Sequence, residues 1–75
     1  MAREQQVEIL AEMVANVLVV SVESGASVAA GDTVVLLESM KMEIPVLAER
    51  GGTVVEIKVA TGDVVQEGDV LVVLG

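Results

Sequence analysis

The sequence matches itself when it is shifted by 37 positions, and this internal repeat constrains the fold more than any other feature. About eleven of the thirty pairs aligned between residues 9–38 and 46–75 are identical. Valine is so common in this chain that some valine pairs match by chance. A chance alignment of two pairs of glycines is not expected. The aligned glycines are Gly25 with Gly62 and Gly31 with Gly68. The repeat therefore predicts two units of one plan, each too small to stand alone, that close on each other.

Each half has the pattern of short strands separated by tight turns. Alternation with period 2 is typical of a half-buried strand. The core-facing residues predicted from it are Leu18, Val20 and Val22 in the first half and Val55, Ile57 and Val59 in the second. The four aligned glycines are expected in the turns, because glycine accepts a positive φ at no steric cost. Such short, regularly interrupted strands predict an all-β sandwich or flattened barrel.

A helix competes with this interpretation only near the N-terminus. Apolar residues at positions 7, 10, 11 and 14 have helical spacing. However, residues 9–12 align with residues 46–49, which directly follow Pro45, and proline does not fit inside a helix. We expect a strand from about residue 7, after a flexible tail over residues 1–6.

The composition argues against several classes of site. The chain has no Cys and no His, so disulfides and the usual zinc sites are excluded, and we expect no metal. There is no Phe, Tyr or Trp on which bases could stack, and the net charge of −8 repels phosphate backbones, so nucleic acid is not an expected partner.

No nucleophile–base pair is present, so we expect no enzyme active site. The apolar runs are too short to span a membrane, and we expect a cytoplasmic domain with no membrane partner.

One segment, residues 39–45 with the sequence SMKMEIP, is not explained by the repeat. It joins the last strand of the first half to the first strand of the second, and a connection this short predicts a hairpin. Pro45 lacks a backbone donor, so the returning strand should start near it or lie at a sheet edge. Lys41 should then lie at or beside the hairpin tip, near the approximate two-fold axis and away from the chain termini.

Lys41 has unusual neighbours for a lysine on a turn. It is one of only two lysines, and it lies between Met40 and Met42, with Glu38 and Glu43 just outside them. Strand alternation would place both methionines on one face and Lys41 on the other. A lysine on a turn is usually only solvated, and methionines usually fill cores. Apolar side chains at an exposed tip are costly unless another molecule contacts them, so the combination predicts a recognition site.

These residues resemble a known family. The stretch ESMKMEIPV resembles the attachment motif of biotin carboxyl carrier domains, in which Ala or Ser precedes Met-Lys-Met. A second pattern resembles the wider biotinyl/lipoyl family and consists of Val59, Gly62, Asp63, Val65, Gly68, Asp69 and Leu71. The resemblance covers residues 7–75 and implies one attachment domain there. It implies a flattened barrel of two four-stranded antiparallel sheets.

The resemblance also implies a function. Lys41 would be the residue to which a biotin protein ligase joins biotin through an amide bond. The residues that would guide the ligase are Glu38, Ser39, Met40, Met42 and Glu43. The biotinyl arm would then carry a carboxyl group between the biotin carboxylase and carboxyltransferase sites of a biotin-dependent, acyl-CoA carboxylase. The chain would be a non-catalytic carrier, monomeric when isolated, and Lys58 on the outer face of a strand would stay unmodified.

Two alternatives stay open, namely a lipoyl-type acyl carrier on the same scaffold and an unmodified interaction domain. Lipoyl carriers usually have Asp-Lys-Ala around the lysine, so Met-Lys-Met favours biotin.

The chain departs from the family pattern in two places. Many carriers have a Pro-Met-Pro-Gly turn opposite the lysine hairpin, where this chain has EMVAN at residues 12–16. Residues 23–32 align with residues 60–69 without a gap, so the thumb that some carriers insert there is absent.

Overall fold

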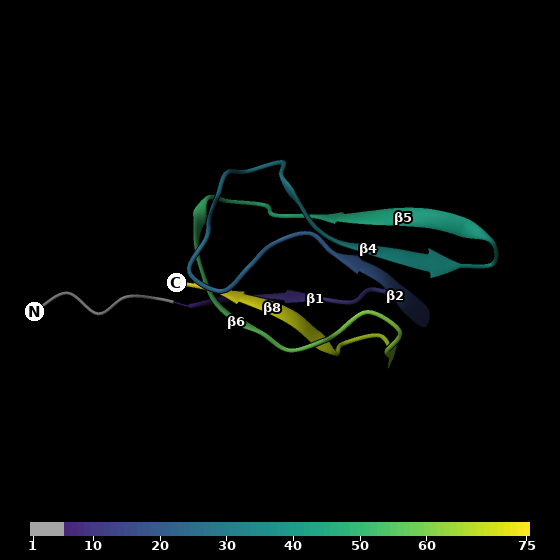
Figure 1. Cartoon of the computed structure of the whole chain (residues 1–75). Helices are drawn as coiled ribbons and strands as arrows, with labels where there is room; N and C mark the ends of the chain where they lie inside the picture. Colours follow the sequence, from purple (N-terminus) through teal and green to yellow (C-terminus); the bar gives the residue numbers. More distant parts are fainter. Residues whose placement is uncertain (1–5) are drawn as a thin grey trace, which may run out of the picture.

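A computed structural model of the chain describes residues 6–75, and its ordered elements are all strands (Figure 1). Residues 1–5 of the predicted tail lie outside the described residues. The strands are β1 (Val7–Leu10), β2 (Ala15–Val20), β3 (Ser27–Val28), β4 (Thr33–Ser39), β5 (Met42–Leu47), β6 (Gly52–Ile57), β7 (Val64–Val65) and β8 (Val70–Leu74). The described part of the chain contains no helix, and hence none that could cross a membrane.

The strands form two four-stranded antiparallel sheets, with the orders β1-β8-β6-β3 and β5-β4-β2-β7. The repeat relates β1 to β5, β2 to β6, β3 to β7 and β4 to β8. Exchanging the two strands of each pair converts one sheet order into the other. The repeat in the sequence is thus a two-fold relation between the sheets. The predicted fold, a flattened barrel with an internal two-fold repeat, is confirmed.

The core between the sheets is built from the positions that the repeat keeps. All the buried side chains are aliphatic, and no polar side chain is buried among residues 6–75. The buried pairs related by the repeat are Ala11 and Ala48, Val17 and Val54, Val28 and Val65, Val34 and Leu71, Val35 and Val72, and Leu37 and Leu74. Because these side chains come from both halves, neither half has a core of its own.

The predicted alternation is wrong at the start of β2 and β6, because each strand contains an irregularity. The register shifts between Val17 and Val19 in β2 and between Val54 and Glu56 in β6. A bulge of this kind places an extra residue in one strand and reverses which face the following residues occupy. Val54 is therefore buried, whereas Val55, which the alternation predicts to face the core, is 45% exposed.

Beyond these irregularities the predicted residues do face inward. Val20, Val22, Ile57 and Val59 all pack against the core. Leu18, which corresponds to Val55, is only partly buried and does not belong to that cluster. The alternation in the sequence is thus correct from Val20 and Ile57 onward, but its first predicted residue in each half does not join the core.

The turns use glycine followed by aspartate. All four predicted turn glycines have φ between 90° and 97°, in the region that L-residues avoid. In three turns an aspartate carboxylate accepts a backbone hydrogen bond from the residue three positions earlier. The bonds to Asp32, Asp63 and Asp69 measure 2.8, 2.9 and 2.8 Å. The fourth turn, at Gly25, has Ala26 where the repeat predicts aspartate, so this carboxylate bond is missing.

The β4–β5 hairpin lies at the end of the molecule opposite to the start of β1 and the end of β8 (Figure 1). The pairing shows why: Val7 pairs with Leu74 at one end, and the repeat relates this pair to Ile44 and Leu37 beside the hairpin. The hairpin thus occupies the position that corresponds, by the two-fold relation, to the two ends of the chain. Pro45 lies within β5, which is an edge strand, so its missing donor interrupts no ladder between inner strands.

Candidate functional site

The hairpin that carries Lys41 is as tight as a hairpin can ordinarily be. The last pair of the β4–β5 ladder is Ser39 with Met42, which leaves only Met40 and Lys41 in the turn. Their φ angles are 54° and 65°. A two-residue turn with positive φ at both central residues is the type I′ turn, whose twist matches that of the flanking strands. The segment outside the repeat is therefore mostly strand, and only these two residues form the turn.

This backbone conformation is unfavourable for the two residues that adopt it. Type I′ turns strongly prefer Asn-Gly, because other side chains crowd the backbone at positive φ. The cost is roughly 1–2 kcal/mol for each residue with a Cβ. The ladder that imposes the turn joins six residue pairs, from Thr33–Leu47 to Ser39–Met42. Strain held in place by its surroundings is common at functional sites, where it presents a side chain in a fixed position.

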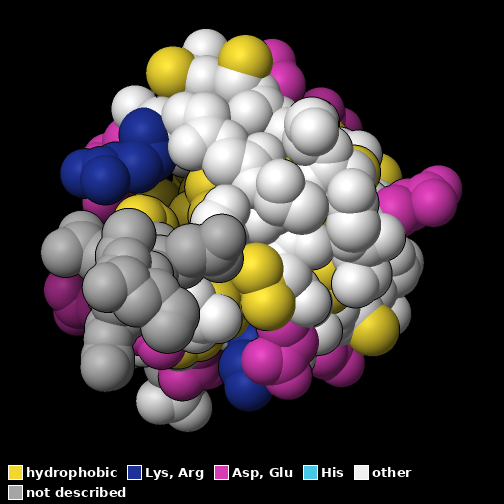
Figure 2. Space-filling view, turned by 90° about the vertical axis from the view of Figure 1, so that its left-hand side faces the viewer, with side chains coloured by type: hydrophobic (Ala, Val, Ile, Leu, Met, Phe, Trp, Pro, Cys, Tyr) yellow, Lys and Arg dark blue, Asp and Glu magenta, His cyan; other side chains and the backbone are white. Residues whose placement is uncertain are grey.

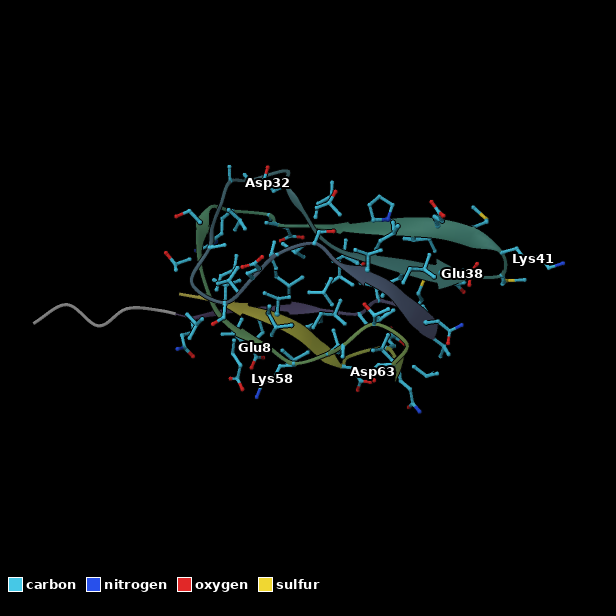
Figure 3. All side chains as sticks on the ribbon, viewed as in Figure 1. Glu8, Asp32, Glu38, Lys41, Lys58 and Asp63 are labelled. Carbon is cyan, nitrogen blue, oxygen red and sulfur yellow. The ribbon has the colours of Figure 1, made fainter. Side chains whose placement is uncertain are left out.

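The turn exposes Lys41 and its neighbours. Lys41 lies at the tip, and its side chain points away from the body of the domain (Figure 3). Met40 is 91% exposed and Met42 is 64% exposed, although both are apolar. The strand alternation predicted through these residues is wrong for this segment, because the chain turns at Met40 and Lys41. Neither methionine fills the core, so the packing of the fold does not explain their identity.

The two lysines differ in their surroundings. Lys58 forms an ion pair with Glu56, with its Nζ 3.1 Å from the carboxylate. It directly follows β6 rather than lying within it, and its backbone N–H still donates to the carbonyl of Leu71 at 2.9 Å. Among residues 6–75 Lys41 takes part in no ion pair, and Figure 3 shows the two lysines at separate places on the surface. Only Lys41 therefore presents a projecting amine with no partner among the described residues.

The two acids flanking the Met-Lys-Met segment face each other. Glu38 and Glu43 are directly opposite in the β4–β5 ladder. Like charges at such positions destabilise a sheet by roughly 0.2–1 kcal/mol. The same row of the sheet continues through Asn16 in β2 to Val64 in β7. The hairpin thus combines strain in its turn with charge repulsion in its ladder, and neither feature stabilises the fold.

Sequence reasoning missed a small depression beside the lysine, of about 300 Å³. Its walls include Lys41 together with Val14, Asn16, Glu38, Ser39, Met40 and Val64. Val14 and Val64 are 63% and 67% exposed, the largest fractions among the exposed valines of residues 6–75. They come from segments far apart in the sequence, and the pairing of β2 with β7 brings them together. A comparison of the two halves of the sequence would have indicated these two valines, because the repeat aligns Val14 with Gly51 and Val64 with Ser27.

The comparison with protein families agrees with this geometry. The family model Biotin_lipoyl, described as "Biotin-requiring enzyme", matches residues 7–74. The chain belongs to this family. The resemblance drawn from the Met-Lys-Met segment and the glycine–aspartate turns is thereby confirmed. A domain of this family is a carrier rather than a catalyst in its own right.

Curated relatives of the Biotin_lipoyl domain include small mycobacterial proteins. The chain is 60% identical over 38 residues to the biotinylated protein TB7.3 homolog of Mycolicibacterium smegmatis. It has the same identity to the biotinylated protein TB7.3 of Mycobacterium tuberculosis. Each match covers 51% of this chain and 54% of the relative, so the similarity spans about half of each protein.

Solved structures with the same fold belong to much larger proteins. A single-chain, multi-domain long-chain acyl-CoA carboxylase matches with 33% identity and a TM-score of 0.86, over 97% of this chain and 8% of its own. The urea carboxylase of Kluyveromyces lactis matches with 29% identity and a TM-score of 0.90, over 100% of this chain and 7% of its own. This Biotin_lipoyl domain is therefore similar to a small part of each carboxylase.

Proposed function

We propose that the chain is a biotin carboxyl carrier domain and that Lys41 carries biotin through an amide bond to its Nζ. The observation that carries the proposal is the projecting amine of Lys41 on a strained two-residue turn between exposed methionines. Membership of the Biotin_lipoyl family and similarity to proteins named as biotinylated support the identity of the cofactor.

The surroundings of Lys41 fit such an attachment. The amine takes part in no ion pair among the described residues, so an incoming ligase has none to break there. The type I′ turn fixes the direction of the lysine side chain, while its four-carbon stem stays flexible. Bound biotin supplies a ureido nitrogen that accepts and releases a carboxyl group. The chain itself supplies a rigid base for the arm and a surface by which partners recognise it.

Recognition by the biotin protein ligase has to distinguish two lysines. We assign this choice to the residues around the turn, namely Glu38, Ser39, Met40, Met42 and Glu43. The exposed methionines offer apolar contact directly beside Lys41, and the two opposed acids offer charge. Lys58 lies beside a strand and is paired with Glu56, so we propose that it stays unmodified.

The wider role is that of a mobile carrier within a carboxylase. The arm would carry the carboxyl group between biotin carboxylase and carboxyltransferase sites, where tethering replaces dilute biotin by a high local concentration. The likeness to a domain of a long-chain acyl-CoA carboxylase supports an acyl-CoA substrate for the whole assembly.

The net charge of −8 favours docking on basic patches of partner proteins. We propose a monomeric, non-catalytic domain over residues 7–75, located in the cytoplasm, where ATP for biotinylation is available.

Intact-mass measurement after incubation with a biotin protein ligase, ATP and biotin tests the proposal. The wild-type chain and Lys58→Arg should each gain one biotinyl group, and Lys41→Arg should gain none. Lys58→Arg is the matched control, since it makes the same change at the other lysine. An adduct that persists in Lys41→Arg would refute the assignment. Modification by a lipoate ligase but not by a biotin ligase would instead favour the lipoyl alternative.

A further inference from the structure

The two ends of the domain are related by the repeat, yet among residues 6–75 they differ in the side chains that they expose. Val64 pairs with Asn16 beside the hairpin, and the matching pair at the other end is Ser27 with Thr53. Val14 likewise corresponds to Gly51. Because serine and glycine fill these positions in the same scaffold, the fold does not require valine there. In the part of the opposite end that Figure 2 colours by side-chain type, backbone and other atoms predominate, and hydrophobic side chains appear at separate places.

The valines at the lysine end form two walls of the depression of about 300 Å³. Its volume lies at the lower end of the range for small-molecule sites, roughly 300–1,000 Å³. Lys41 forms part of the same depression. A group attached to the lysine amine can therefore reach this space by folding back along the turn, since the lysine stem is flexible.

We propose that this depression is a resting site for the ring system of biotin attached to Lys41. The inference rests on the proposed attachment and adds a second contact between carrier and cofactor. A short tether gives an effective concentration in the millimolar range, so even a weak site is partly filled. Free biotin in solution, at far lower concentration, would leave it empty.

The chemistry of the walls matches the two sides of the biotin ring system. Val14, Val64 and the thioether of Met40 offer apolar contact to the sulfur-containing ring. The Glu38 carboxylate can accept hydrogen bonds from the ureido N–H groups. Asn16 and Ser39 can donate to the ureido oxygen. The depression has both apolar and polar walls. The biotin ring system, which also has both characters, therefore fits it better than a purely apolar group would.

Nuclear magnetic resonance on the full chain tests the inference, comparing apo and biotinylated protein after intact mass has established that biotin is attached. We expect amide shift changes at Val14, Asn16 and Val64 as well as in the turn. We also expect nuclear Overhauser contacts between ring protons and the methyls of Val14 and Val64. Val55 is the internal control, because it is 45% exposed and lies beside Gly75 at the opposite end.

Two variants sharpen the test. Val64→Ser installs the residue that the repeat places at position 27, so the scaffold should accept it. In its biotinylated form the shift changes at Val14 and Asn16 should fall at least about twofold, since the substitution removes an apolar wall from a site that the tether only partly fills. Val55→Ser makes the same substitution at the other end and should leave these changes as they are.

The outcomes separate the two proposals. If no biotin is added, the attachment fails and the resting site fails with it. If biotin is added but the shift changes stay confined to residues 39–43, the attachment stands and the resting site is refuted. The resting site is also refuted if Val64→Ser leaves the changes at Val14 and Asn16 intact, and the valines would then serve as a surface for a protein partner.

Discussion

Replacing Met40 by asparagine should make the domain more stable. Met40 has φ of 54° and is 91% exposed, so the substitution relieves an unfavourable backbone conformation and removes almost no buried surface. Asparagine adopts positive φ far more readily than methionine, for which the cost is roughly 1–2 kcal/mol. We expect a gain of about 1 kcal/mol in the free energy of unfolding. For a domain of this size that gain raises Tm by about 4–8 °C.

Met42→Asn is the matched control for this prediction. It makes the same chemical change two residues away, but Met42 is the first residue of β5 and does not have positive φ. Asparagine is disfavoured in strands, so we expect no gain in stability there and a small loss. Urea titration followed by circular dichroism measures both variants. If Met40→Asn is no more stable than the wild type, or if Met42→Asn gains equally, the claim of a strained turn is refuted.

The same variant should be modified more slowly by the biotin ligase, because the exposed methionine is proposed as part of the recognised surface. A gain in stability together with a loss of modification would show that the residue serves recognition at a cost to the fold. Rates of biotin incorporation, measured below saturation, test this.

Three further predictions concern the scaffold. Leu37→Ala should lower the free energy of unfolding by about 2–5 kcal/mol, because Leu37 is 1% exposed in the shared core, and a smaller loss in urea titration would contradict that packing. Ala26→Asp should add the carboxylate bond seen at Asp63 and raise stability by at most about 1 kcal/mol, because Ala26 also packs partly against the core; thermal melting would reveal or exclude the gain. Glu43→Gln should raise stability by about 0.2–1 kcal/mol by relieving repulsion from Glu38, and the gain should shrink at high salt.

Much of the fold could be predicted from the repeat because the same positions recur in both halves. Val17 and Val54, or Leu37 and Leu74, match in the sequence since each pair fills related places in one core. The repeat also located Lys41, because a segment that belongs to neither half has to join them. The change of face at Val55 could not be predicted in this way, since a bulge leaves no mark in an alternating pattern.

The details of the site were harder to predict for two physical reasons. The turn at Met40 and Lys41 lacks the Asn-Gly signal of a type I′ hairpin, so its conformation follows from the ladder on both sides and not from local preference. The depression depends on Val14 and Val64, which lie fifty positions apart in the sequence and meet only through the pairing of β2 with β7. The spacing of these two valines along the chain does not indicate that they lie close together in the fold.

Residue-resolved mass spectrometry of the protein purified from cells that contain a biotin ligase tests the central claim most directly. After proteolysis, the fragment that contains Lys41 should carry one biotinyl group, with the fragment ions placing it on that lysine. The fragment that contains Lys58 should carry none. A chain that carries no biotin under these conditions, or that carries it on Lys58, would contradict the proposed attachment.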